Sequence, residues 1–306
     1  MELAIVSFAS IENINKEITG VSALLEKRLK YGLRYISFEN DFPLEVCNEF
    51  KKAKVIPIIT WELFFPIHDG HNRRQCLKEE THLRELLEGK FDDYLDNFAT
   101  QAKLWQDTIY LRPLHEFNAG WYVWGGAKNG GIDGGPSLVK QCWIYIVDRF
   151  RKLKADNVKW IWCPHEPSMN VPMDEWNHIR NYWPGDEYVD LLGIDGFNFY
   201  PENPEREKPS FYDFESLFAE MYAQVMALSN KPIFIMTGTA EFSREGKISS
   251  KPDWINDAFE KIRNNYTRIT IVCWFHYKYS EKIDWRIDSS RESLKAFSTQ
   301  MSRIKV

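Results

Sequence analysis

Short apolar runs typical of β-strands alternate with longer segments of helical periodicity along the whole chain. The strand-like runs cover residues 3–8, 34–38, 55–60, 108–112, 158–163, 189–194, 233–236 and 269–274. Between them, apolar residues recur at helical spacing, for example over residues 91–105, 137–153, 214–228, 254–262 and 294–301. This alternation predicts an α/β fold, a single (β/α)8 TIM barrel formed by residues 1–306 as one domain. A doubly wound sheet is the alternative, but no GxGxxG follows an early strand.

Composition narrows the possible partners. The 306 residues are 44% hydrophobic and carry a net charge of only -5, so we expect a large core and no nucleic-acid partner. No apolar run is long enough to cross a membrane, and the N-terminus has no signal-peptide pattern. The five cysteines are dispersed and form no CxxC pair, which mildly favours a reducing, cytoplasmic compartment, although a removed leader would give the same sequence.

The segment after the third predicted strand is long, polar and rich in histidine. Its three histidines are loosely spaced, and no HExxH arrangement accompanies them (His68, His71 and His82). Tight spacing on one element is typical of protein metal sites. We therefore interpret this segment as a solvated loop and expect no metal site in it.

Polar and aromatic residues gather where the predicted strands end. In a (β/α)8 barrel the active site lies at the carboxyl ends of the strands, so these side chains are expected to meet at one mouth. The strand ends carry Glu39, Trp61, Glu62, His115, Glu116, His165, Glu166, Asp195, Glu241, Trp274 and His276. This regular placement favours an enzyme over a structural protein.

The densest of these groups is residues 112–126. Arg112, His115, Glu116 and Asn118 stand here beside tryptophans and glycines. Such polar groups can reach sugar hydroxyls, flat rings can cover the apolar faces of pyranoses, and a carboxyl group can move a proton. The alternative is a buried ion pair within an aromatic core, but buried charges are seldom gathered so densely without a functional role.

Several blocks of the sequence resemble glycoside hydrolase family 26, the β-mannanase family of a clan of retaining barrel glycosidases. The residues R-P-L-H-E-F-N from Arg112, followed by Trp121, Trp124 and Gly125, are similar to the signature after the fourth strand of that family. The block 183–198, with L-L-G-I-D-G-F-N at its end, resembles the sixth-strand region. Residues 231–236, 272–275 and 284–288 resemble the seventh strand, the last strand and the closing loop.

The resemblance implies retaining hydrolysis of β-1,4-linked mannan-like polysaccharide by two carboxyl groups. Glu116 matches the acid/base, and His115 would orient the nucleophile or the substrate. Asn118 and Arg112 would hold the hydrogen-bond geometry of the site. This chemistry requires neither a metal nor an organic cofactor. His115 is equally well interpreted as a core histidine. The implied substrate-binding set also includes Trp121, Trp124, Asp195, Phe197, Tyr200, Trp274 and, as a distal sugar platform, Trp61.

The seventh strand departs from the family pattern. Where the family has its nucleophilic glutamate, this chain has Thr237, and the next carboxylate is Glu241. Either the strand end is rearranged and Glu241 serves as the nucleophile, or the family's glutamate is missing. A threonine hydroxyl is a poor substitute because it is neutral and needs its own base.

Four functions therefore stay open. The first is an endo-β-mannanase-like hydrolase with Glu116 and Glu241 as its catalytic pair. The second is a β-1,3-1,4-glucanase (lichenase) on the same scaffold. The third is a catalytically impaired carbohydrate-binding barrel. The fourth is inverting hydrolysis, in which Glu166, Glu62 or Asp195 activates water opposite Glu116. All four share a polysaccharide or oligosaccharide partner, and loops 65–87 and 201–210 are expected to shape the cleft.

Overall fold

The computed structural model describes residues 1–304 except 39, 65–81, 168–170, 172–173, 202–209 and 282. Glu39, His68, His71 and most of the two loops expected to shape the cleft lie outside these described residues. His82 lies inside them, and its ring contacts the Glu85 carboxylate within helix α4 (Leu83–Leu87).

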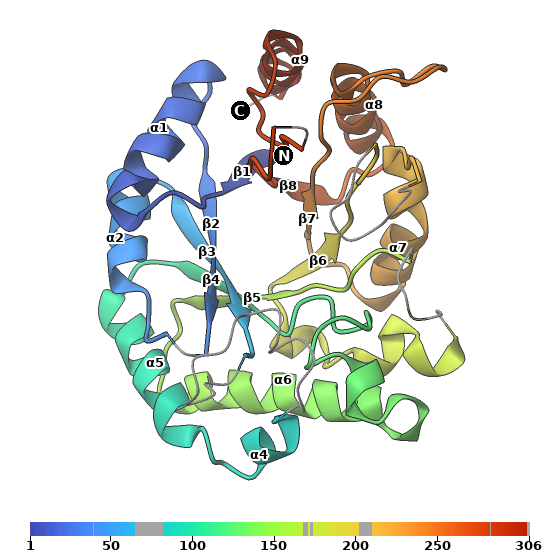
Figure 1. Cartoon of the computed structure of the whole chain (residues 1–306). Coiled ribbons are helices and arrows are strands. Elements are labelled where there is room, and N and C mark those ends of the chain that lie inside the picture. Colours follow the sequence, from blue (N-terminus) through green and yellow to red (C-terminus); the bar gives the residue numbers. More distant parts are fainter. Residues whose placement is uncertain are drawn as a thin grey trace.

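Eight parallel strands close into a barrel in sequence order (Figure 1). Each strand pairs with the next, and β1 pairs with β8 so that Ile5 lies opposite Trp274. The predicted (β/α)8 barrel is confirmed, and the doubly wound sheet is excluded because such a sheet is open. The strands are β1 (Glu2–Val6), β2 (Tyr31–Ser37), β3 (Ile56–Glu62), β4 (Ile109–Pro113), β5 (Val158–Trp162), β6 (Leu191–Asp195), β7 (Ile233–Thr237) and β8 (Ile269–Trp274).

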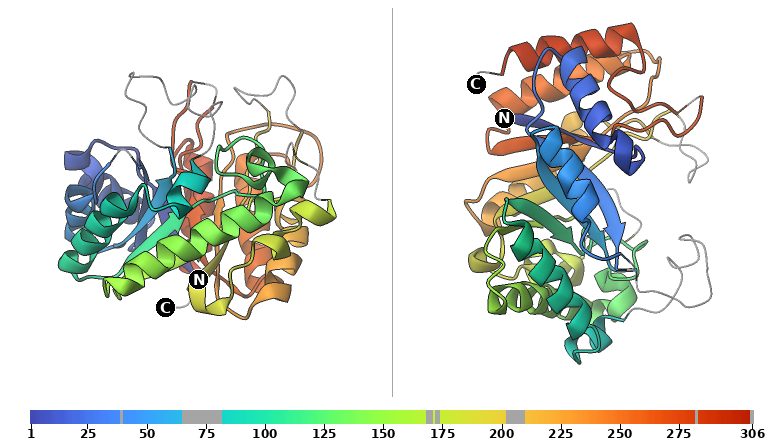
Figure 2. Two further views of the ribbon diagram at one scale, coloured as in Figure 1. Left: turned by 90° about the horizontal axis from the view of Figure 1, so that it is seen from below. Right: turned by 90° about the vertical axis from the view of Figure 1, so that its left-hand side faces the viewer.

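Helices surround the barrel, and several begin at a residue whose side chain caps the first turn. Asp213, Ser250 and Ser290 each accept a hydrogen bond from the backbone N–H three residues further on. Helices α8 and α9 lie side by side, as both views show (Figures 1 and 2). The helices are α1 (Ile14–Leu24), α2 (Leu44–Lys52), α4 (Leu83–Leu87), α5 (Asp92–Trp105), α6 (Gly135–Lys152), α7 (Phe214–Leu228), α8 (Lys251–Asn264) and α9 (Arg291–Ser302).

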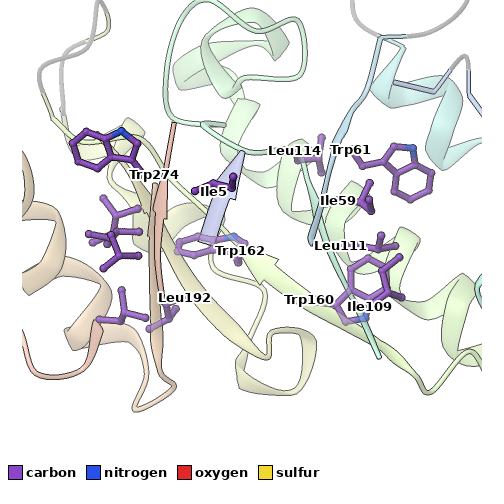
Figure 3. Close-up of a cluster of buried hydrophobic side chains, with 14 of the residues drawn as sticks. Ile5, Ile59, Trp61, Ile109, Leu111, Leu114, Trp160, Trp162, Leu192 and Trp274 are labelled. Atoms are coloured by element: carbon purple, nitrogen blue, oxygen red, sulfur yellow. The ribbon is translucent and has the colours of Figure 1, made fainter. Parts of the chain in front are cut away.

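Alternation along the strands divides the core into two layers. One set of side chains packs between the strands and the helices, and the other fills the barrel interior. Figure 3 shows part of the outer layer, including Ile59, Trp61, Leu111, Leu192 and Trp274. The interior layer includes Leu33, Ile58, Ile161, Cys163, Phe234, Met236, Ile271 and Cys273. The tryptophans at the ends of β3 and β8 therefore belong to the helix-facing layer.

The described residues contain neither a membrane-spanning helix nor a cluster of metal ligands. Within them, no helix combines the length and apolar character of a membrane span. The same residues contain no group of three or more His, Cys, Asp or Glu side chains arranged to hold a metal ion.

Candidate active site

A buried ion pair inside the barrel connects β4 with β6. Arg112 Nη1 lies 2.5 Å from Asp195 Oδ2, and both side chains are fully buried. The guanidinium also donates to Thr60 Oγ1 on β3 at 3.0 Å and to Tyr35 Oη on β2 at 3.3 Å. Arg112 can make these contacts together because its planar fork presents several fixed donors. Through these contacts Arg112 connects β2, β3, β4 and β6 just below the mouth of the barrel.

The backbone that positions Glu116 near this ion pair has an uncommon conformation. Its φ is 55°, and Leu114 two residues earlier has φ 51°, a left-handed conformation that is uncommon for residues other than glycine. The backbone N–H of Glu116 donates to the Cys163 carbonyl at 2.7 Å, and the Trp121 indole donates to Glu116 Oε2, also at 2.7 Å. Two non-glycine residues in this conformation, held by specific hydrogen bonds, are typical of a functional site.

The surroundings of Glu116 favour its protonated form. Burial and the negative charge of Asp195 raise the pKa of Glu116 well above its usual range, and a hydrogen bond between the two carboxyl groups raises it further. Arg112 and the Trp121 indole partly oppose this rise. Two carboxyl groups can share a hydrogen bond only when one of them carries the proton. The arrangement therefore holds a proton on Glu116, where a general acid needs it.

His115 is neutral in this environment. Burial, followed by the nearby charges of Arg112 and His165, lowers the pKa of His115 well below its usual range. Its Nε2 lies 3.1 Å from Tyr122 Oη, and its Nδ1 has no hydrogen-bond partner among the described residues. The histidine therefore contributes a neutral ring to the mouth.

Asn118 joins two loops. Its amide group exchanges hydrogen bonds with the backbone of His165, at 3.0 Å through the Asn118 side-chain N–H and at 2.8 Å through the His165 N–H. The loop after β4 is thus fixed to the loop after β5. The role predicted for Asn118, holding the geometry of the site, agrees with these contacts.

The predicted aromatic platforms divide into two groups. Trp121 is half-buried beside Glu116, and Phe197 lies inside the barrel stacked on Trp285 with ring centres 5.6 Å apart. Tyr200 is half-buried against Phe211 and Phe242. By contrast, the rings of Trp61, Trp124 and Trp274 are fully buried.

The three buried tryptophans have core partners. Trp61 stacks on Phe98, Trp124 stacks on Tyr122, and Trp274 packs edge-on against Phe297 of α9. No ring face of these three residues is left open toward a sugar. Their contacts therefore assign them to positioning the strands and the loop after β4.

The Glu241 carboxylate is hydrogen-bonded to two serine hydroxyl groups. Its Oε1 accepts hydrogen bonds from the hydroxyl groups of Ser289 and Ser293, both at 2.6 Å, next to the start of α9. At the end of β7, Thr237 is buried, and its hydroxyl has no hydrogen-bond partner among the described residues. The carboxyl group whose charge raises the pKa of Glu116 is Asp195. Glu62 and Glu166 are also buried at strand ends.

Four residues of the mouth were not singled out from the sequence. Tyr35 and Cys163 contact Arg112, and Cys163 Sγ lies 3.1 Å from Asp195 Oδ1. Phe275 and Trp285 pack edge-on against each other beside Phe197. One signal in the sequence could have found Tyr35. Alternate residues of a strand face the same side, and Tyr35 follows Tyr31 and Leu33 at this spacing, both of which face the barrel interior.

Comparison with known proteins gives the family. The sequence profile of glycosyl hydrolase family 26 matches residues 78–283, which is more than half of the chain. The chain belongs to glycosyl hydrolase family 26. The resemblance of residues 112–125 and 183–198 to this family is therefore confirmed.

Relatives of this chain differ in the substrates that their names indicate. Endoglucanase H of Acetivibrio thermocellus is 34% identical over 216 residues, covering 70% of this chain and 22% of the relative. A mannan endo-1,4-β-mannosidase of Bacillus subtilis is 31% identical over 168 residues, covering 49% of this chain and 44% of the relative. This chain thus spans less than half the length of either relative.

Solved structures share the fold. The catalytic domain of an endo-β-1,4-mannanase of glycoside hydrolase family 26 from Bacillus sp. JAMB-750 superposes with a TM-score of 0.68. The comparison covers 99% of this chain and 85% of that domain, at 18% sequence identity. At this identity the likeness supports the barrel and not a particular substrate.

Proposed function

We propose that this chain hydrolyses β-1,4-linked mannan-like polysaccharide, with Glu116 as the group that protonates the departing sugar oxygen. One observation carries the proposal: Glu116 is buried at the barrel mouth and accepts a hydrogen bond from the Trp121 indole N–H, while burial and the charge of Asp195 raise its pKa. A general acid must hold its proton near neutral pH and lie where a substrate can reach it. Family membership and the mannanase relatives support mannan as the substrate class.

Double displacement requires a second carboxylate that attacks the anomeric carbon, and Glu241 is the proposed nucleophile. Because retaining enzymes place their two carboxyl groups about 5–5.5 Å apart, Glu241 would have to exchange Ser289 and Ser293 for the sugar. Replacing Glu241 by alanine would then abolish turnover while glycan binding persists. Full turnover in this variant would remove Glu241 from the mechanism and direct the search to Asp195, Glu62 or Glu166 as the base of an inverting reaction.

A carbohydrate-binding barrel with impaired turnover is the second candidate. It is favoured by the same two contacts of Glu241 and by Thr237 at the end of β7. In such a protein the mouth would still bind a glycan, because Arg112, Glu116 and Trp121 do not depend on a nucleophile. Measurable affinity for mannan without any release of reducing ends would identify it.

A β-1,3-1,4-glucanase is the third candidate, supported by the 34% identity to Endoglucanase H. The decisive assay compares wild type with Glu116→Ala on mannan, glucomannan and lichenan. Release of reducing ends from mannan by the wild type, and its loss in the variant, would support the main proposal. Release from lichenan alone would replace mannan by mixed-linkage glucan, and no release together with no binding would contradict every one of these functions.

A further inference from the structure

Three exposed aromatic rings lie together at the rim where β1 and β8 end. Phe8 is 39% exposed, Tyr277 is 36% exposed and Tyr279 is 49% exposed. The ring centres of Phe8 and Tyr277 are 4.7 Å apart, and those of Tyr277 and Tyr279 are 5.2 Å apart. Single exposed apolar residues need no explanation, but a contiguous group of large rings indicates a binding surface. We name Phe8, Tyr277 and Tyr279 the rim aromatics.

The loop that presents the two tyrosines is firmly anchored. Tyr279 N–H donates to the Ile283 carbonyl at 2.8 Å, and Trp285 N–H donates to the Tyr277 carbonyl at 2.9 Å. Ile283 and Trp285 are buried and belong to the barrel-interior cluster. The loop thus buries two apolar side chains while holding two tyrosine rings outside. A rigid aromatic surface of this kind loses little conformational entropy when it binds a ligand.

The rim aromatics are continuous with the site around Glu116. Phe8 stacks on Tyr35 with ring centres 6.1 Å apart and an interplanar angle of 13°. Tyr35 in turn contacts the His115 ring at 5.9 Å and accepts a hydrogen bond from Arg112. In the closed strand order β8 lies across the barrel from β4, the strand that precedes Glu116. A ligand reaching from Trp121 to the rim aromatics would therefore cross the mouth.

We propose that the rim aromatics form a further sugar subsite, which binds a pyranose unit of the same glycan chain whose scissile linkage lies at Glu116. This inference rests on the proposed function, because it takes the ligand at Glu116 to be a β-linked polysaccharide. The rings offer flat apolar faces to the C–H side of a pyranose. The occupant is a neutral glycan, and the subsite adds affinity only for chains long enough to reach it.

The test compares long and short substrates in single variants of the rim. In Tyr277→Ala and Phe8→Ala, we expect the KM for β-1,4-mannohexaose to rise about 3- to 10-fold, the range of one lost aromatic contact. The kcat, and the KM for a short aryl β-mannobioside, should stay within about 2-fold of the wild type. Tyr277→Phe should retain the long-chain KM because it keeps the ring. Leu104→Ala, on a 68% exposed residue of α5, is the matched control.

The outcomes separate this inference from the proposed function. If wild type cleaves mannohexaose and the KM is unchanged in both Tyr277→Ala and Phe8→Ala, the subsite is wrong while the proposed function stands. If wild type binds mannohexaose without cleaving it, the Kd of the oligosaccharide replaces the KM, with the same expected rise. If wild type neither binds nor cleaves any β-glycan of the panel, both proposals fall. Near-ultraviolet circular dichroism of the tryptophans checks that each variant is folded.

Discussion

Arg112 Nη1 lies 2.5 Å from Asp195 Oδ2, and both side chains are fully buried inside the barrel. The pair has two consequences. It joins β4 to β6, and it fixes the carboxylate whose charge raises the pKa of Glu116. Stability and acid chemistry are therefore coupled at a single point of the molecule.

Breaking this ion pair should destabilise the fold strongly. Arg112→Met leaves Asp195 buried without its partner, and such losses cost about 3–5 kcal/mol. Urea unfolding followed by tryptophan fluorescence measures the change. In the double variant Arg112→Met/Asp195→Leu the loss should be smaller than the sum of the two single losses, because neither charge is then stranded. Additive losses would show that the two groups do not interact as the structure indicates.

The pH profile should report the influence of Asp195 on Glu116. A general acid works while protonated, so activity falls as pH rises through the pKa of Glu116. Asp195 raises that pKa, so Asp195→Asn should lower it and move the basic limb of kcat/KM toward lower pH. Asp190→Asn is the control, because Asp190 precedes β6 and bonds the Trp160 N–H at the opposite end of the strand. An unmoved limb in Asp195→Asn would refute the coupling.

The contacts of Glu241 predict a structural contribution. Glu241→Ala removes the acceptor of two serine hydroxyls at the start of α9, and unpaired partly buried donors cost about 1–3 kcal/mol. Glu245→Ala, on an exposed residue nearby, should stay within about 0.5 kcal/mol of wild type. Chemical denaturation of both variants is the measurement. Equal stability of the two would mean that the serine contacts contribute nothing to folding.

Lys251 should give the protein a distinct alkaline pH dependence. Burial lowers the pKa of Lys251 from 10.5 to about 7, while Glu241 and the aspartates nearby oppose the shift. Between these two pKa values the unfolded chain binds more protons than the native chain, so this group makes stability increase with pH by up to about 1.4 kcal/mol per unit. Its contribution is complete above the unfolded pKa and is lost as pH falls toward 7.

The measurement is the free energy of unfolding between pH 7 and 10, compared for wild type and Lys251→Met. The methionine variant also loses the bonds from Nζ to the carbonyls of Asp284 and Arg286, so its absolute stability will fall. The informative quantity is therefore the difference in slope with pH. Parallel curves would show that Lys251 titrates alike in the native and unfolded chains.

Much of the fold followed from the sequence because apolar strand runs are local signals. The run predicted at 269–274 coincides with β8, and the other strands shift by a few residues at their ends. Side-chain parity at a strand end is a weaker signal, because a displacement of one residue moves a side chain to the opposite face. Trp274 thus lies among the helices, while the neighbouring Phe275 packs on Trp285 at the mouth.

The site was predictable where its residues are contiguous and less so where it is assembled across strands. Residues 112–118 could be recognised as a group, and the structure places Arg112, Glu116 and Asn118 together around one mouth. The bond from Arg112 to Asp195 joins residues 83 positions apart, and no local pattern encodes it. The Ser289 and Ser293 contacts of Glu241 likewise depend on how α9 packs beside α8.

Glu116 as proton donor is tested most directly by comparing leaving groups. Polysaccharide linkages need protonation of the departing oxygen, whereas a 2,4-dinitrophenyl β-mannobioside has a leaving group that needs none. For Glu116→Gln we predict a loss of about 10²- to 10⁴-fold in kcat/KM on mannan and a loss below about 10-fold on the aryl glycoside. Equal losses on both substrates, or full activity on mannan, would contradict the assignment.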